Sequence, residues 1–218
     1  MIITKIAEDK GQKKGKHEIK RKWFMENNID VSGFPIPVGD YIEITEAVQK
    51  VIDRRGDKLK KMDLLGVTKI SVDTKENLQE IISNLFGSKK NESGKKESTH
   101  PRFRDEIILA QENNIKMYVL VEHGGNIRTI EDVPEWKNPR QFLYEREIRK
   151  IFNIPRDCDF KAEVADLKQH GVKVRRGPNT GEELYKAMKT MEGEYGCEFL
   201  FCDKKSTGRR IIELLGGE

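Results

Sequence analysis

Two aspartates and a lysine on two predicted strands have the residue types and spacing that metal-dependent hydrolysis of phosphate esters uses. Asp40 lies in PVGDYI, and Asp73 and Lys75 lie in ISVDTK. Side chains alternate between the faces of a strand, so Asp73 and Lys75 point to the same side. Two carboxylates can hold a hard divalent cation such as Mg2+, and the carbonyl oxygen of Thr74 offers a further ligand. The pattern predicts Asp40, Asp73 and Thr74 as metal ligands.

The chemistry of such a site follows from its charges. The bound ion would polarise a phosphodiester and make a nearby water molecule a stronger nucleophile. The ammonium of Lys75 would orient that water or offset charge that develops on the phosphate. In the simpler interpretation, Asp73 and Lys75 form a surface ion pair worth about 0–1 kcal/mol. Residue spacing alone leaves both interpretations open.

Basic residues are clustered, although the overall charge is nearly balanced. The chain has 218 residues, with 41 Lys and Arg against 37 Asp and Glu and a net charge of +4. Three basic clusters stand at residues 10–22, 54–61 and 89–104. Clusters around one acidic site favour a polyanionic substrate, whose charge must be neutralised along its path. We expect Lys58, Lys89 and Lys90 to contact DNA; a solvated surface is the alternative for each cluster.

Cysteine usage and hydropathy restrict the classes of protein. Cys158, Cys197 and Cys202 have neither metal-ligand spacing nor a disulfide framework, which favours reduced thiols in the cytoplasm. No apolar run reaches about 18 residues, so no membrane-spanning helix is expected. The first residues do not favour a signal peptide. The sequence has no Gly-rich phosphate loop before Lys-Ser or Lys-Thr, which argues against an ATP-driven motor.

Predicted strands alternate with predicted helices, which indicates one α/β domain over residues 1–218 with a central mixed sheet flanked by helices. A basic, helix-leaning insertion is expected at about 46–65. Residues 87–100, GSKKNESGKKESTH, are expected to form a mobile polar loop, either an inert linker or a segment that becomes ordered on DNA. A helix at 17–27 is expected to bury Ile19, Trp23 and Phe24, and a short strand is expected at 172–174.

The order of these pieces resembles the XPF-type nuclease domain, a branch of the PD-(D/E)xK superfamily. That family carries G-D, then E-R-K-x-x-x-D, then a helix with R-x-x-x-Q, then a Y-L-V-E strand. The matching pieces are Gly39-Asp40, Asp73-Thr74-Lys75, Arg102 to Glu106, and Tyr118 to Glu122. HPRFRDE and TGRRIIELL are similar to stretches of the short bacteriophage and prophage members. The resemblance covers most of the chain and implies a restriction-endonuclease-like layered fold.

The resemblance also implies roles for single residues. Asp40 and Asp73 would bind Mg2+, with Mn2+ as a substitute, and Lys75 would be the catalytic lysine. Arg102 would contact a DNA phosphate near the cut, and Arg104 is a neighbouring candidate.

An acid near the first strand, Glu8 or Asp9, would join the site. The sequence departs from the family at four positions. Asp73, a shorter carboxylate, stands where the family has glutamate. Thr74 replaces the arginine, Gln79 the trailing aspartate and Glu106 the helical glutamine. Glu106 is itself a candidate ligand.

The implied function is a Mg2+-dependent DNA endonuclease that acts on branched, flap or junction DNA in phage or prophage DNA metabolism. A catalytically inactive DNA-binding or scaffold relative is the alternative, and an RNA-directed enzyme is a third. No tandem helix-hairpin-helix module follows the nuclease-like part. Recognition of branched DNA would therefore rest on this domain, on a homodimer or on a separate partner, in the cytoplasm of a bacterial host cell.

Overall fold

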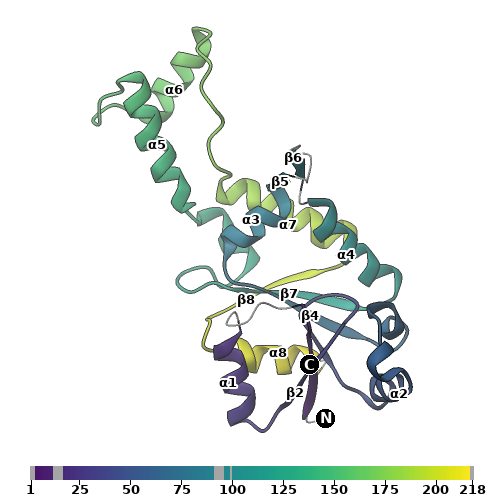
Figure 1. The fold of residues 1–218 in the computed structure, drawn as a ribbon. Helices are drawn as coiled ribbons and strands as arrows, with labels where there is room; N and C mark the ends of the chain where they lie inside the picture. The colour runs from purple at the N-terminus through teal and green to yellow at the C-terminus, as the bar shows by residue number, and fades with distance from the viewer. Residues whose placement is uncertain (1–2, 12–16, 91–95, 99, 217–218) are drawn as a thin grey trace.

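A mixed six-stranded sheet forms the centre of the protein (Figure 1). The computed structural model describes residues 3–11, 17–90, 96–98 and 100–216. The strand order is β2-β1-β3-β4-β7-β8. The strands are β1 (Lys5–Asp9), β2 (Asp30–Phe34), β3 (Tyr41–Glu43), β4 (Ile70–Lys75), β7 (Lys116–Glu122) and β8 (Glu198–Cys202).

Strand direction brings the predicted acids to one edge of this sheet. β1 pairs parallel with β2, and β4 with β7 and β7 with β8 are also parallel. β3 is antiparallel to both of its neighbours, β1 and β4. The carboxyl ends of five strands therefore share an edge with the beginning of β3. We call this edge, which carries Asp9, Asp40, Asp73, Lys75 and Glu122, the acidic edge.

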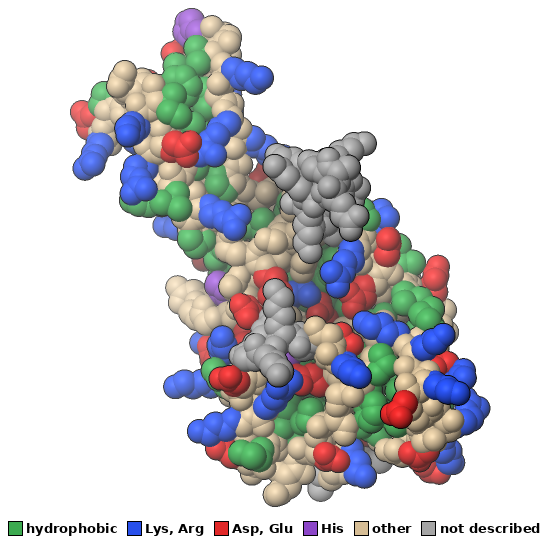
Figure 2. All heavy atoms as spheres, viewed as in Figure 1, with side chains coloured by type: hydrophobic (Ala, Val, Ile, Leu, Met, Phe, Trp, Pro, Cys, Tyr) green, Lys and Arg blue, Asp and Glu red, His purple; other side chains and the backbone are tan. Residues whose placement is uncertain are grey.

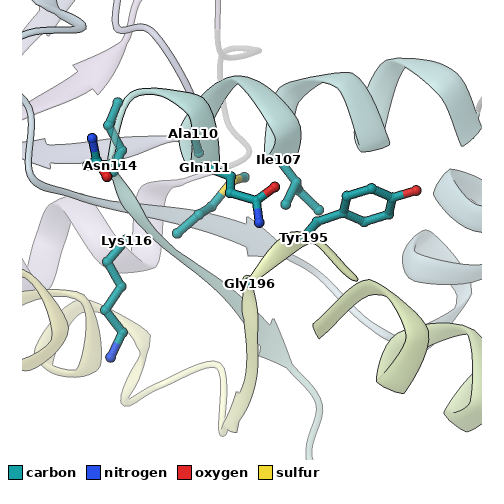
Figure 3. Close-up of a pocket in the computed structure, with 9 residues that line it drawn as sticks. Ile107, Ala110, Gln111, Asn114, Lys116, Tyr195 and Gly196 are labelled. Atoms are coloured by element: carbon teal, nitrogen blue, oxygen red, sulfur yellow. The ribbon is translucent and has the colours of Figure 1, made fainter. Parts of the chain in front are cut away.

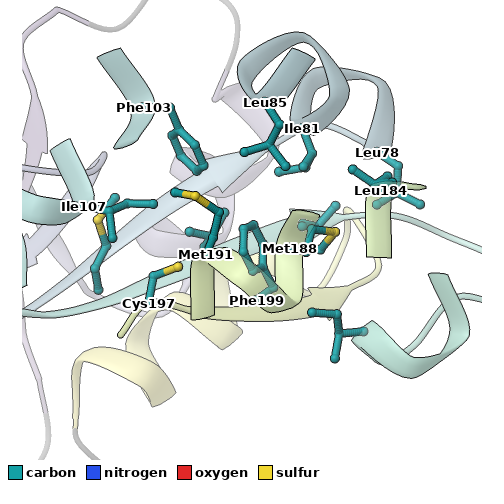
Figure 4. Packing of buried hydrophobic residues seen from close by; sticks show 14 of the residues in the cluster. Leu78, Ile81, Leu85, Phe103, Ile107, Leu184, Met188, Met191, Cys197 and Phe199 are labelled. Atoms are coloured by element: carbon teal, nitrogen blue, oxygen red, sulfur yellow. The ribbon is translucent and has the colours of Figure 1, made fainter. Parts of the chain in front are cut away.

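Helices cover both faces of the sheet (Figure 1). On one face, α3 (Leu78–Phe86), α4 (His100–Glu112) and α7 (Gly181–Tyr195) pack on β7 and β8 through a large hydrophobic cluster (Figure 4). Leu78, Ile81 and Leu85 of α3 are spaced for one buried face of a helix. On the other face, α1 (Glu18–Glu26) and α8 (Thr207–Leu215) pack on Tyr41 and Val72. The expected α/β fold with a central mixed sheet flanked by helices is confirmed.

The predicted insertion at 46–65 is helical. It contains α2 (Glu46–Arg55) and two short 3-10 helices, η1 (Gly56–Lys58) and η2 (Lys61–Leu64). Its apolar residues pack on Ala7 and Ile42 of the sheet. Thr45 caps α2, because its hydroxyl accepts a hydrogen bond from the backbone of Val48.

The expectation of a loop at 87–100 is corrected in part. Two short strands, β5 (Ser88–Lys90) and β6 (Lys96–Ser98), pair antiparallel in this segment. An antiparallel pair satisfies backbone groups that a loop would leave to water. Residues 91–95 and 99, which belong to the same expected loop, lie outside the described residues.

Two helices project from the body as an arm (Figure 1). They are α5 (Pro139–Phe152) and α6 (Phe160–Gln169), which follow a 3-10 helix, η3 (Ile130–Glu135). The arm has a small hydrophobic cluster of its own, built on Tyr144, Ile148, Ile154, Phe160 and Val164. The sequence expectation counted this segment within one domain of 218 residues.

None of the helices among the described residues combines the length and the hydropathy that crossing a membrane would need.

Candidate active site

Backbone hydrogen bonds hold Asp40 between β1 and β4. Its amide donates to the carbonyl of Val72 at 2.9 Å, and its carbonyl accepts from the amide of Asp9 at 2.9 Å. Gly39 precedes it with a φ of +70°, and a Cβ there would lie 2.3 Å from the hydroxyl oxygen of Ser71. Only glycine fits a left-handed backbone at such a close approach. Gly39 thus lets the chain bring Asp40 against the end of β4.

The Asp40 carboxylate is oriented by Thr74. Its Oδ2 accepts hydrogen bonds from the backbone amide of Thr74 at 2.9 Å and from the hydroxyl of Thr74 at 2.5 Å. Both residues are buried, at 7% and 1% exposure. Charge-assisted hydrogen bonds of this kind fix the geometry of a carboxylate. The structure thereby places the two predicted residues in direct contact.

Asp73 and Lys75 form a buried ion pair on the opposite side of β4 from Val72. Lys75 Nζ lies 2.5 Å from Asp73 Oδ2, and the side chains of Lys75 and Asp73 are only 11% and 6% exposed. The ammonium also lies 5.2 Å from the ring centre of Phe103. This burial argues against the surface ion pair of the simpler interpretation, because such pairs gain their small energy in water.

The pKa of Asp73 reports the charges around it. Burial raises this pKa most; Lys75 opposes the rise, and the carboxylates of Asp40 and Glu106 add to it, so that the pKa reaches about 7. Burial lowers the pKa of Lys75, but Asp73 and Asp40 outweigh burial and raise it. Asp73 therefore interacts with one cation, Lys75, and with two other acids, Asp40 and Glu106, at the acidic edge.

Glu106 of α4 belongs to this group. It lies half-buried on the face of α4 that packs on the sheet, one turn after Phe103, and its Oε1 accepts a hydrogen bond from the amide of Gly39 at 2.8 Å. Helix spacing of three to four residues places these two side chains on one face. The residue that departs from the resembled family thus fastens the turn that carries Asp40.

A buried cation that the sequence interpretation missed also lies at this edge. Lys20 of α1, 3% exposed, pairs with the buried carboxylate of Glu122 at the end of β7. Its ammonium also donates to the hydroxyl of Thr74 at 3.3 Å. Hydrogen bonds therefore link Glu122 and Lys20 through Thr74 to Asp40. Lys20 stands one helical turn before the buried Phe24. This spacing of four residues was the sequence signal that Lys20 lies on the buried face of α1.

Glu8 lies at the same edge but faces α1. Its carboxylate contacts His17 Nδ1 at 2.6 Å and accepts from the hydroxyl of Tyr41 at 2.8 Å and from Arg21 at 2.5 and 2.9 Å. Burial favours a higher pKa, but the hydrogen bonds from His17, Arg21 and Tyr41 prevail and lower it to about 2. Both carboxylate oxygens of Glu8 are thus engaged by hydrogen-bonding side chains, and these contacts connect α1 to the sheet. Asp9 lies 3.6 Å from the ammonium of Lys61.

The predicted DNA-binding residues lie on three elements, α4, η1 and β5. Arg102 is exposed, one turn before Glu106 on α4, and Arg104 pairs with Asp105 at 3.0 Å. Lys58 is exposed on η1 and lines a surface hollow of about 650 Å³. Lys89 and Lys90 lie in β5. Contacts with DNA stay predictions for all five.

Gln79, another departure from the resembled family, lies in the first turn of α3, which follows β4. Its amide nitrogen donates to the side chain of Asn138 at 2.8 Å, and Asn138 caps the beginning of α5. Gln79 therefore connects α3 to the base of the arm.

Metal ligation stays a prediction. Among the described residues, no three or more His, Cys, Asp or Glu side chains are grouped so as to hold a metal ion by themselves. Mg2+ commonly uses one or two carboxylates and completes its shell with water and substrate phosphates. Asp40 and Asp73 supply hard oxygen donors. Burial first, and then the carboxylates of Asp40 and Glu106, raise the pKa of Asp73, and a bound cation would favour its ionised form against all three. The donor chemistry fits such a metal.

A second hollow lies at the other edge of the sheet (Figure 3). It has a volume of about 340 Å³, and its lining includes Gln111, Asn114, Lys116 and Tyr195. Lys116 begins β7, whereas Glu122 ends it at the acidic edge. Lys116 is the one charged residue of this lining among the described residues, so the hollow has no acid–base pair there.

Comparison with known proteins gives one structural match. No model of a protein family matches the chain, and no curated protein matches it. The chain is similar to the structure of XPF from Aeropyrum pernix in complex with DNA, with a TM-score of 0.47 and 13% sequence identity. The match covers 98% of this chain and 64% of that one, so this chain spans less than two thirds of the length of that protein.

Proposed function

We propose that the protein is a metal-dependent DNA endonuclease of the restriction-endonuclease-like, XPF-type group. The observation that carries the proposal is the meeting of Asp40, Asp73 and Lys75 at one sheet edge, where their charges interact. Structural ion pairs also perturb pKa values, but a buried acid that keeps its proton to about pH 7 beside two other acids is costly to a fold. Such a cost is typical of a site that is kept for function.

Each residue has a role in this proposal. Asp40 and Asp73, with the carbonyl of Thr74, would hold Mg2+ or Mn2+, which when bound supplies Lewis acidity toward the phosphodiester. Thr74 keeps the Asp40 carboxylate in one orientation through two hydrogen bonds. Lys75 carries its proton, because its pKa is raised, and its ammonium is available to stabilise charge on the phosphate while water displaces the leaving oxygen.

The arginine of the resembled motif has a substitute in this chain. Thr74 stands at its position, and the ammonium of Lys20 lies against the Thr74 hydroxyl. Lys20 thus supplies a cation from α1 where the motif would supply one from β4.

The finer parts of the proposal follow from the resemblance. The substrate would be branched, flap or junction DNA in phage or prophage DNA metabolism, in the cytoplasm of a bacterial host. Arg102, Arg104, Lys58, Lys89 and Lys90 would contact its phosphates. A homodimer or a separate DNA-recognition partner would complete its grip on DNA.

Cleavage assays test the proposal. Labelled flap, fork, junction and linear duplex DNA would be incubated with the protein and Mg2+ or with EDTA, beside Asp73→Asn, Lys75→Met and the matched surface variant Asp105→Asn. We expect cleavage only with metal, retained in Asp105→Asn and lost by at least about 100-fold in the other two. Cleavage that survives Asp73→Asn and Lys75→Met would place the active site elsewhere. Salt-sensitive DNA binding without cleavage under either metal would instead identify a DNA-binding relative.

A further inference from the structure

The arm, counted with residues 170–176 that lead from α6 back toward α7, carries the net charge of the protein. Between residues 139 and 176 there are 10 Lys and Arg against 6 Asp and Glu, a net of +4. The whole chain has 41 against 37, so the remaining residues balance at 31 against 31. By these counts the positive excess is carried entirely by residues 139–176. Figure 2 shows basic side chains on the part that projects from the body.

Many of the arm's cations are not matched by an acid of the protein. Seven of its basic residues are exposed and form no ion pair within 4 Å among the described residues: Arg140, Arg146, Lys150, Arg156, Lys161, Lys168 and Lys173. Arg149 and Arg175, in contrast, pair with Glu145 and Glu147 of the same arm. The free cations are available to a polyanion at no cost in broken ion pairs.

Two of these cations and an aromatic ring form a stripe on α5. Phe142, Arg146 and Lys150 follow one another at intervals of four residues, which places them on one face of the helix. All three are exposed, and Phe142 is 70% exposed. The helix has 14 residues and is about 21 Å long. Duplex DNA presents one phosphate charge per about 1.7 Å of its axis, so this length spans several phosphates.

The arm is built to keep its shape. Tyr144 and Phe160 meet edge to face with ring centres 5.9 Å apart. Arg149 lies over the Phe160 ring at 5.2 Å and donates to the carbonyls of Pro155 and Cys158 in the turn between the helices. The Tyr144 hydroxyl donates to the carbonyl of Arg175 on the returning segment at 2.9 Å. A rigid arm loses little entropy when it binds a ligand.

The base of the arm is fastened close to the acidic edge. Asn138 caps α5, accepts from the amide of Gln79 at 2.8 Å and donates to the carbonyl of Asn179 at 2.8 Å. Gln79 lies in α3, four residues after Lys75. The arm therefore starts within about one helical turn of the strand that carries Asp73 and extends away from the sheet.

We propose that the α5–α6 arm is a DNA-binding element that grips the phosphate backbone beside the acidic edge, through the stripe of Arg146 and Lys150. This inference rests on the proposed function for its polyanion. It assigns the grip on DNA to a part of this chain that none of the expected binding residues occupies. Charge complementarity favours DNA as the occupant over a second, equally basic copy of the arm.

Equilibrium binding tests the arm without requiring catalysis. A labelled flap DNA with duplex arms of about 30 base pairs would be titrated in EDTA at several salt concentrations. The chain would be compared with Arg146→Ala/Lys150→Ala and with a charge-matched control, Lys69→Ala/Lys116→Ala. The control residues lie at the start of β4 and β7, on the edge opposite the acids. Thermal melting would verify that the exposed substitutions leave the fold intact.

The expected result is a change in salt dependence. Each lost phosphate contact lowers the slope of log affinity against log salt by about 0.9, so the arm variant should lose about 1.8. Extrapolated from 1 M to 0.1 M salt, that slope corresponds to a loss of affinity of up to about 60-fold. The control should keep the slope of the unmodified chain. An unchanged slope in a folded arm variant would overturn the proposal.

Two further outcomes separate the hypotheses. If Phe142→Ser converts a dimer to a monomer while Arg146→Ala/Lys150→Ala binds DNA normally, the arm is a self-association surface and the proposal is wrong. Arm-dependent binding without cleavage under any metal would uphold the arm and refute the nuclease. If the parent chain cleaves DNA and Arg146→Ala/Lys150→Ala binds DNA normally, the nuclease is upheld and the role of the arm is refuted.

Discussion

Replacing Asp73 by asparagine should stabilise the metal-free protein at alkaline pH. An unfolded aspartate ionises near pH 3.8, whereas folded Asp73 keeps its proton to about pH 7. Between these values unfolding releases a proton, so the free energy of unfolding falls as pH rises. The contribution of Asp73 to stability is fully present below pH 3.8 and is completely lost above pH 7. An asparagine side chain cannot ionise, and the Asp73→Asn variant should therefore lack this dependence.

The size of the effect follows from the shift. Each pKa unit corresponds to about 1.4 kcal/mol, so ionised Asp73 costs about 4 kcal/mol of stability above pH 7. This shift already includes the attraction of Lys75, which lowers the Asp73 pKa. The variant should therefore be about 4 kcal/mol more stable than the parent chain at pH 8, and the difference should fall below about 2 kcal/mol at about pH 4–5.

Urea unfolding in EDTA at pH values from about 4 to 8 measures this difference. Asp105→Asn is the matched control, because Asp105 is 62% exposed on α4 and its substitution should leave the pH dependence unchanged. If Asp73→Asn were less stable than the parent chain at pH 8, with the same pH dependence, Asp73 would not be held among repelling acids. The electrostatic description of the site would then be wrong.

Three other substitutions test parts of the same edge, each by urea unfolding. Glu8→Gln should lower the free energy of unfolding by about 3 kcal/mol at pH 7, because the pKa of the Glu8 carboxylate is lowered from 4.5 to about 2 in the folded protein. The stability difference between the variant and the parent chain should shrink as pH falls through that range, and a constant difference would refute this prediction. Lys20→Met should lower the free energy of unfolding by about 3–5 kcal/mol, because it leaves Glu122 buried without its cation. The double variant Lys20→Met/Glu122→Leu should recover most of this loss. A double variant that is as destabilised as Lys20→Met alone would argue against a buried pair. Gly39→Ala should cost more than about 1 kcal/mol, because of its positive φ and the contact with Ser71, and a neutral result would contradict that geometry.

The part of the site that lies on strands was predictable from sequence. Alternation along β4 gives Asp73 and Lys75 a common face whatever packs against them. The meeting with Asp40 depends on β3 running antiparallel to β4, and the G-D pair at its start was the sequence signal. Glu106 was a candidate for the site, and its position follows from the same helix face that buries Phe103.

The buried polar contacts were not predictable in the same way. The stripe expected for the first helix included Ile19, yet Ile19 is 46% exposed and Lys20 is 3% exposed. A lysine is rarely buried unless an acid pairs with it, and Glu122 is supplied by a strand 102 residues away. Local periodicity has no access to a partner at that separation.

The arm also differs from its expectation. The alternating residues 172–174 predicted a strand, but this segment forms none. It leads from α6 back to α7, away from the sheet (Figure 1). The helix α6 and the strand β2 were not anticipated. Both are short, and their stability comes from packing on neighbours rather than from their own propensity.

Titration of Mn2+ into the protein, followed by electron paramagnetic resonance, tests the central claim most directly. Asp40 and Asp73 are proposed to share one cation, so the parent chain should bind Mn2+, and Asp40→Asn and Asp73→Asn should each weaken that binding by at least about tenfold. Asp105→Asn should bind it as the parent chain does. Mn2+ binding that is unaffected by both substitutions, or absent from the parent chain with DNA present, would contradict the claim.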